Sequence, residues 1–478
     1  MTDRTFVGKW WLPSAPERAV GGILTVDASG GCHLQLTGSL LPNPHARSES
    51  NREVDEPAQH LHGSADDEDF TLIDAWVTNF APLLGDEPQE IRVHAVLRGV
   101  HLESPDQPCF TASEVEIDNL TAWSGITGFE SSQEYEVDEN GAPRGLSVAR
   151  WELRTPSGER PVGDLGDFTV ELRWQSTFSI ATKDRNARRE VSASEEVHAM
   201  ISSSRPMPWD GFQGKTKILQ DLITFATRHA CAIRSVKLIH DEPEVGEVEL
   251  LYAPLVQPAE DAPTTIFRYV FQMRDMRLGE LLPKWYALHT KVGMGIHVLF
   301  GLDYNSRGFI ENQILNATSA AESIHRALRP EARSIPEDAH GSLVEMVNER
   351  IDHENRDWLL ERLNNGAGFV QRMRELVNIP AAQAVAEVVG DANQWVRWAR
   401  DARNAVAHLE GRNFERIPSG ARWGLPAATI GLLHLVLLAE LGFSNEVQTQ
   451  AGQNIYAPRA TRFREAVTER MRRSGGGS

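Results

Sequence analysis

The sequence predicts an α+β protein in which an antiparallel, β-rich N-terminal domain precedes an all-α C-terminal bundle. Three observations predict this class. Residues 1–204 contain many short runs of alternating polar and apolar residues, the two prolines of residues 205–208 interrupt the pattern, and from residue 278 onward apolar residues recur at helical spacing. Because 478 residues exceed what one ordinary core requires, we expect two or three domains.

The N-terminal region carries the signals of an antiparallel sheet. Residues 22–27 and 32–38 alternate, and the Ala-Ser-Gly-Gly sequence between them predicts a hairpin. Further strands are predicted at residues 70–76, 91–97, 168–174 and 177–180. Many short strands at such spacing indicate a sandwich or a barrel-like domain, for which we set the boundary at residues 1–204.

The remaining chain is predicted to be mixed and then helical. Residues 205–300 form a mixed connecting segment with a helix at 209–231 and a strand at 249–252. Residues 301–473 form the bundle, and residues 474–478 have the composition of an added flexible linker. Bundle helices are expected at residues 309–328, 391–410, 427–441 and 459–473, with two or three more within 343–373.

Composition limits the classes of function. The net charge of -19 argues against a protein that coats nucleic acid along its whole surface. Residues 391–478 nevertheless contain 12 arginines and 8 acidic residues, a net charge of +4, which leaves -23 for the rest. A mildly basic end suits local contact with a few phosphates.

The compartment is also constrained. The three cysteines lie far apart in the sequence, which gives neither a disulfide framework nor a zinc motif. The N-terminus lacks the layout of a signal peptide, and no apolar run approaches the roughly 18 residues of a membrane span. We therefore expect a soluble cytoplasmic protein without a cofactor or metal.

One short motif carries the chemistry of this sequence. Arg403 is followed by Asn404, and His408 stands five positions after the arginine, within a strongly helical pattern. Histidine titrates near neutrality and exchanges protons, whereas arginine offers a permanent charge to phosphate oxygens. The pair suits metal-independent RNA cleavage by the 2′-hydroxyl, with Asn404 orienting a partner and with Arg397 and Arg400 as substrate contacts.

If residues 391–410 form one helix, its two faces differ. An apolar stripe that includes Trp395, Trp398, Val406 and Leu409 would face the core, and His408 would point away from it. Arg403 and His408 lie roughly 140° apart around such a helix. They meet if the arginine curls round the helix, if the helix is distorted, or if a second copy packs against this face in a homodimer.

These residues and the N-terminal sequence together resemble the ApeA-like family. The motif from Arg403 to His408, the earlier helix containing Glu322 and His325, and the opening Gly-Lys-Trp-Trp-Leu-Pro at residues 8–13 are similar to that family. The resemblance implies a bacterial anti-phage protein that acts by abortive infection, with a C-terminal HEPN domain that cleaves RNA. It assigns catalysis to Arg403 and His408, with Asn404 as the polar residue after the arginine, and it makes the N-terminal region the sensor or regulatory part. A phage-encoded trigger is among the expected partners.

Other interpretations remain open. The protein is alternatively a non-catalytic HEPN-like binding and dimerisation protein with a β-rich recognition domain. A third hypothesis is a glycan-binding β-domain that uses Trp10, Trp11 and Trp76. His434, in a helix that is apolar nearly all round, is predicted to be a packed core residue. Glu322 and His325 share one helix face, and we expect a structural role for both.

Overall fold

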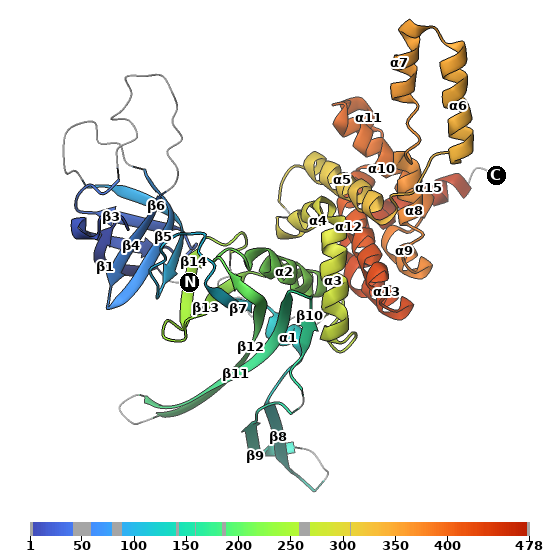
Figure 1. Cartoon of the computed structure of the whole chain (residues 1–478). Helices are drawn as coiled ribbons and strands as arrows, with labels where there is room; N and C mark the ends of the chain where they lie inside the picture. The colour runs from blue at the N-terminus through green and yellow to red at the C-terminus, as the bar shows by residue number, and fades with distance from the viewer. Residues whose placement is uncertain are drawn as a thin grey trace. The chain divides into compact units, whose positions relative to one another are not determined.

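The structure is a computed structural model that describes residues 3–41, 59–78, 88–139, 143–157, 159–183, 188–257, 268–305 and 307–475 (Figure 1). The chain forms two compact units. The first comprises residues 1–223, 230–265 and 277–283, and the second comprises residues 224–229, 266–276 and 284–478. The predicted α+β class is confirmed, because a β-rich unit with a barrel accounts for the N-terminal part and helices account for the C-terminal part.

Six antiparallel strands of the first unit close into a barrel. Their order is β6-β3-β2-β1-β4-β5, and β5 pairs with β6 to complete the ring. The strands are β1 (Arg4–Trp11), β2 (Val20–Val26), β3 (Cys32–Leu36), β4 (Gln59–Ala65), β5 (Glu68–Val77) and β6 (Glu90–Arg98). The predicted hairpin is β2–β3, with Asp27 accepting the backbone N–H groups of Ser29 and Gly31 in the turn. Closure removes the unpaired edges that an open sheet would present.

Trp10 fills the interior of this barrel. Its side chain is fully buried, and it lies edge-on to Phe70 with ring centroids 5.7 Å apart. A Cβ atom at Gly63 would lie 2.0 Å from the Trp10 ring, so only glycine fits opposite the indole. The hypothesis of glycan binding through Trp10 is therefore wrong, because this ring is closed off from any ligand. Trp76 is 42% exposed and lies beside the Arg92 guanidinium.

The same sheet continues beyond the barrel as an open antiparallel layer. From β6 the order runs through β14 (Glu247–Tyr252), β13 (Ile233–His240), β7 (Phe110–Ile117), β12 (Arg188–Met207), β11 (Phe168–Lys183) and β10 (Val162–Asp164). Two of these strands, β13 and β14, come from the segment predicted to be a connection. The runs predicted at 168–174 and 177–180 form one strand, since β11 and β12 pair without interruption through Gln175 and Ser176.

Two short helices and a separate hairpin complete the β-rich part. Helix α1 (Leu120–Ser124) follows β7, and α2 (Gln213–Thr227) follows β12. The hairpin of β8 (Phe129–Val137) and β9 (Pro143–Leu153) forms its own two-stranded sheet.

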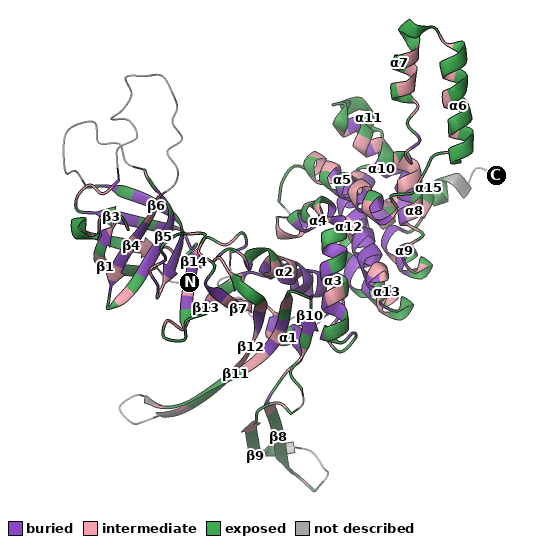
Figure 2. Cartoon of the chain, viewed as in Figure 1, coloured by how far each residue is buried: buried purple, intermediate pink, exposed green. Residues whose placement is uncertain are grey.

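The second unit is helical and is organised around α12 (Ser419–Leu441). Fifteen of its residues are buried, as Figure 2 shows by its purple colour. The other helices of this unit are α4 (Met294–Tyr304), α5 (Ile310–Leu328), α6 (Glu337–Arg350), α7 (His353–Arg362), α8 (Phe369–Leu376), α9 (Ala382–Val389), α10 (Ala392–Ala407), α11 (Gly411–Glu415), α13 (Asn445–Ala451), α14 (Ala457–Arg459) and α15 (Thr461–Gly475). Helix α3 (Leu278–Val292) belongs to the first unit up to Pro283 and to the second from Lys284. The prediction of a buried central helix at this position is confirmed.

Helix α12 also corrects the expectation about apolar length. By length and composition it could cross a membrane, although the sequence was expected to contain no such segment. In this structure 78% of its most apolar window is buried within the chain, so the apolar surface is covered by other helices. Gly424 permits the closest of these contacts, because a Cβ atom there would lie 2.4 Å from the backbone nitrogen of Phe463 on α15.

A buried charged cluster lies against α12. Arg228 Nη1 is 2.7 Å from Asp303 Oδ1, and His434 Nε2 is 3.0 Å from Asp303 Oδ2. The His434 ring is surrounded by aromatic rings, with the Phe225 centroid at 5.0 Å and the Tyr456 centroid at 5.6 Å. His434 is thus the packed core residue that the sequence predicted, with a carboxylate beside it.

This environment shifts two pKa values. Burial lowers the pKa of His434 to about 4, and the neighbouring Arg228 charge acts in the same direction, while Asp303 opposes them. Burial by itself raises the pKa of Asp303, but the charges of Arg228 and His434 outweigh it and lower that pKa to about 2. The Arg228–Asp303 pair therefore stays ionised, and His434 stays neutral in the folded state at neutral pH.

We predict that His434 makes the helical unit sensitive to mild acid. The unfolded histidine binds a proton below its ordinary pKa of 6.5, whereas the buried one binds it only near 4, so the free energy of unfolding falls as the pH drops between these values. Between pH 7 and pH 5 the loss should be about 2 kcal/mol larger in the wild type than in His434→Gln. Urea unfolding at pH 7 and at pH 5, followed by circular dichroism at 222 nm, measures this loss of the free energy of unfolding.

The exposed His353 at the start of α7 provides the matched control, since His353→Gln should retain the wild-type pH dependence. Equal pH dependence in the wild type and His434→Gln would contradict the depressed pKa.

Candidate active site on α10

Helix α10 presents the motif because its opposite face is fixed in the core. Asp391 caps the N-terminus by accepting the backbone N–H of Gln394 at 2.6 Å. Trp395 donates its indole N–H to Thr429 Oγ1 on α12 at 3.1 Å, and Trp398 packs edge-on against Phe463 on α15. The buried residues of the helix are Trp395, Val396, Trp398, Ala399, Ala402 and Ala405. The helix therefore cannot rotate without exposing two tryptophans.

The helix ends earlier than the sequence predicted. It stops at Ala407 and not at residue 410, and Leu409 adopts a left-handed conformation with a φ of 56°. The Leu409 N–H donates to the Val406 carbonyl, and the Glu410 N–H donates to the Ala405 carbonyl, which is the hydrogen-bond pattern of a Schellman C-cap. Leu409 is consequently 92% exposed, so the prediction that it extends the apolar stripe is wrong.

This ending is unusual in its residue type. A left-handed C-cap normally carries glycine, which has no Cβ to clash, and a non-glycine residue there is strained by roughly 1–3 kcal/mol. The leucine gave no signal for a helix end, which explains the error in the predicted boundary. The consequence is that His408 sits at the C-cap, directly before a turn that leaves the helix axis.

Arg403 is held by contacts with two other helices. Its Nη2 lies 3.6 Å from Glu322 Oε2 on α5, and its guanidinium lies 5.9 Å from the centre of the Phe369 ring at the start of α8. Its Nη1 also donates to Asn404 Oδ1 at 3.4 Å. With 36% of the side chain exposed, the cation is positioned at the surface and remains accessible.

Glu322 and His325, which the sequence placed on one face, have different surroundings. The Glu322 carboxylate is shared between Arg403 and Arg326, at 3.6 and 3.4 Å. His325 is buried, with its Nε2 at 2.6 Å from Glu375 Oε2 on α8. Burial lowers the pKa of His325 and outweighs the hydrogen bond to Glu375. Glu322 therefore contacts the motif, whereas His325 connects α5 to α8.

His408 is separated from Arg403 within one chain. Its side chain is exposed, and among the described residues no hydrogen bond or ion pair joins it to Arg403. Its backbone N–H donates to the Asn404 carbonyl at 3.0 Å. The five-residue step explains the separation, because it places the two side chains on different flanks of the helix.

A polar pocket of about 500 Å³ lies on the Asn404 side of α10. It is bounded by α10, the segment around α11 and the end of α15. Three arginines line it, namely Arg397, Arg416 and Arg470, together with the amides of Gln394, Asn404 and Asn413. Two acidic residues, Asp401 and Glu410, also line it.

Of the two residues predicted to contact the substrate, one lines the pocket and the other does not. Arg397 lines the pocket, whereas Arg400 lies outside it and binds Asp401 through Nε and Nη2 at 2.9 and 2.6 Å. That pairing offsets the Asp401 charge beside the three arginines. Arg416 and Arg470 were missed by sequence reasoning, and the excess of arginine after residue 391 was the signal that pointed to them.

The described residues contain no group of three or more histidine, cysteine, aspartate or glutamate side chains placed to hold a metal ion. The side chains at this surface that can act on a phosphate ester include the imidazole of His408, the guanidinium of Arg403 and the pocket arginines. Such a set can exchange protons and stabilise negative charge on phosphate.

Comparison with known families identifies both parts of the chain. Residues 5–285 match the model of ApeA N-terminal domain 1, and residues 315–447 match that of the Apea-like HEPN domain. The second range contains Glu322, Arg403 and His408. Comparisons with curated proteins and with solved structures gave no match. Since the N-terminal match by itself spans more than half of the 478 residues, the chain belongs to the ApeA family, with a HEPN domain in its C-terminal part.

Proposed function

We propose that this HEPN-family anti-phage protein is an abortive-infection effector that cleaves cellular RNA as a metal-independent endoribonuclease. Membership of the ApeA family supports a role in defence against phage. The observation that supports nuclease activity is the position of Arg403, Asn404 and His408 at the accessible C-terminal end of α10. The tryptophans on the other face of α10 hold this orientation.

The chemistry follows from the two side chains. His408 takes the proton from a ribose 2′-hydroxyl, which attacks the adjacent phosphate, or gives one to the leaving 5′-oxygen. Arg403 stabilises the negative charge that develops on the phosphate oxygens, and Asn404 orients the arginine through its side-chain oxygen. The products are a 2′,3′-cyclic phosphate and a 5′-hydroxyl, and DNA resists because it lacks the attacking group.

A homodimer completes the site in this proposal. Within one chain the exposed His408 and the Glu322-bound Arg403 lie on separate flanks of α10. Two copies packed about a twofold axis on this face would bring two arginines and two histidines into one cleft. Isologous pairing is the commonest assembly of soluble oligomers, and here it would bring an arginine of one copy close to a histidine of the other.

The polar pocket is the proposed path of the RNA strand. Arg397, Arg416 and Arg470 contact phosphates, and the amides of Asn404 and Asn413 contact base edges. Arg400 contributes to the same basic surface from outside the pocket. The acidic body of the chain repels the rest of the polymer, so binding is local.

The N-terminal β-rich unit is the proposed sensor. In this scheme a phage-encoded trigger acts on it and releases the nuclease, which is otherwise restrained. The ion pair of Arg403 with Glu322 favours an alternative, in which the HEPN bundle only binds and dimerises, because the arginine is already engaged by a carboxylate.

We predict that Arg403→Ala and His408→Ala each lower RNA cleavage at least about 100-fold, because each removes a group that acts in the transition state. Cells carrying the wild type, either variant or a control are infected with phage, and RNA ends are sequenced. New 5′-hydroxyl ends should appear with the wild type and be lost with both variants.

Arg326→Ala is the matched control for Arg403, since Arg326 binds the same Glu322 carboxylate but lies outside the motif. His353→Ala controls for removal of an exposed histidine. Protection that survives both motif substitutions, or protection without new RNA ends, would favour the non-catalytic alternative.

We further predict that Arg416→Ala and Arg470→Ala weaken RNA binding through lost phosphate contacts. In an inactive His408→Ala background, each should reduce the slope of log affinity against log salt by about 0.7 for single-stranded RNA. Fluorescence anisotropy with a labelled unstructured RNA measures this slope. Arg472→Ala is the control, because Arg472 is exposed on the same helix outside the pocket. An unchanged slope in both pocket variants would place the RNA elsewhere.

A further inference from the structure

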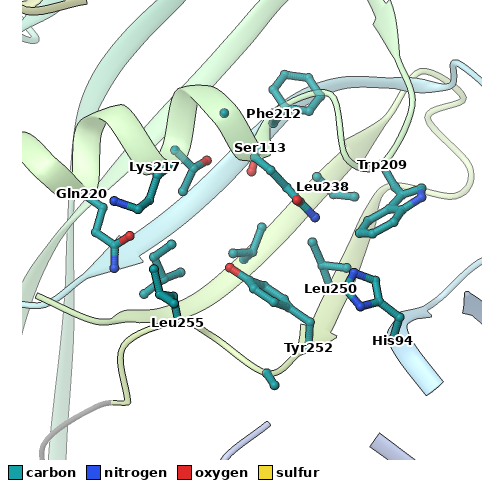
Figure 3. Close-up of a pocket in the computed structure, with 16 residues that line it drawn as sticks. His94, Ser113, Trp209, Phe212, Lys217, Gln220, Leu238, Leu250, Tyr252 and Leu255 are labelled. Carbon is teal, nitrogen blue, oxygen red and sulfur yellow. The ribbon is translucent and has the colours of Figure 1, made fainter. Parts of the chain in front are cut away.

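The N-terminal unit contains a cavity that the proposed nuclease chemistry does not use. It lies between the first turns of α2 and the strands β7, β13 and β14, and its volume is about 430 Å³ (Figure 3). Cavities of this size are typical of sites for small molecules. Its lining residues all belong to the first compact unit.

One end of the cavity has an aromatic wall. Trp209 and Phe212 are buried there, and the imidazole of His94 lies edge-on to Trp209 with ring centroids 6.2 Å apart. Leu238 and Leu250 line the adjoining surface, as Figure 3 shows. Aromatic walls of this kind favour flat rings, which gain both apolar burial and stacked or edge-on contacts.

Two hydroxyl groups provide polar contacts within this apolar surface. Ser113 on β7 is fully buried, and its Oγ has no hydrogen-bond partner among the described residues. Buried hydroxyl groups are almost always paired, so this one is available to a bound molecule. The Tyr252 hydroxyl is directed toward the interior, and burial raises the pKa of this phenol, which keeps it protonated as a donor.

The charge of the cavity is balanced. Among the described residues that line the cavity, only Lys217 has a permanent charge, and its Nζ is paired with the fully buried carboxylate of Asp221 one turn along α2. Because this carboxylate neutralises the ammonium group, the cavity offers no uncompensated cation to a phosphate. An uncharged ligand is therefore favoured over a nucleotide.

We propose that this cavity binds an uncharged planar heteroaromatic molecule, of nucleoside size or smaller. Its ring lies against Trp209, and its hydrogen-bonding edge contacts the hydroxyl groups of Ser113 and Tyr252. Binding does not depend on RNA cleavage by the HEPN domain, so this site and the proposed nuclease are tested separately.

The test uses the full chain with adenosine, uridine and indole as uncharged probes and AMP as the charged comparison. Affinities are measured by ligand-observed NMR titration. We expect saturable binding of at least one uncharged probe, and weaker binding of AMP than of adenosine. Ser113→Ala and Tyr252→Phe should each lower the affinity about fivefold, the value of one hydrogen bond.

Stability separates a binding role from a structural one. Ser113→Ala should leave the melting temperature unchanged or raise it, because the hydroxyl that it removes is unpaired in the free protein. Gly214→Leu places a side chain at the rim of the cavity, where a Cβ atom meets nothing within 4 Å, and should lower affinity at least tenfold.

Gly341→Leu on α6 is the matched control, since it is also a helical glycine with open space around its Cβ position. It should leave binding unchanged. Three results would overturn the proposal: no binding of any uncharged probe at millimolar concentration, tighter binding of AMP than of adenosine, or binding that the Ser113, Tyr252 and Gly214 substitutions do not alter.

Discussion

The burial of α12 determines how the rest of the helical unit is arranged. This helix is apolar on nearly every side, so it is stable only when other helices surround it. Trp395 binds Thr429 on α12, and Trp398 packs on α15, which itself approaches α12 at Gly424. These contacts fix the rotation of α10. The motif is therefore directed outward as a consequence of core packing.

Two features of the HEPN domain lie on opposite flanks of α10: the contacts of Arg403 and an arginine-lined pocket. On one flank, Arg403 is held by Glu322 from α5 and by the ring of Phe369. On the other, Arg397 and Asn404 open onto a pocket with Arg416 and Arg470. His408 follows at the C-cap, where a strained leucine turns the chain away. If the proposed nuclease activity holds, the pairing of Arg403 with Glu322 would have to loosen before the guanidinium could bind a phosphate.

In the β-rich unit, the barrel and the open half of the sheet differ in how their interiors are filled. Trp10 packs against Gly63 inside the barrel, whereas the open half of the same sheet leaves a cavity under α2. The proposed ligand site of this unit therefore lies outside the barrel, in the open half of the sheet.

The sequence by itself determined the fold class, the β2–β3 hairpin, the central helix and the family, because alternation, helical periodicity and short motifs are local properties. It also placed Asn404 and His408 on the outward face of a helix, with Arg403 on its flank. Only the tertiary structure decided that α10 ends at Ala407, that Glu322 binds Arg403, and that Arg416 and Arg470 share a pocket with Arg397. Those features join residues far apart in the chain, and their geometry depends on helix packing that no local pattern encodes.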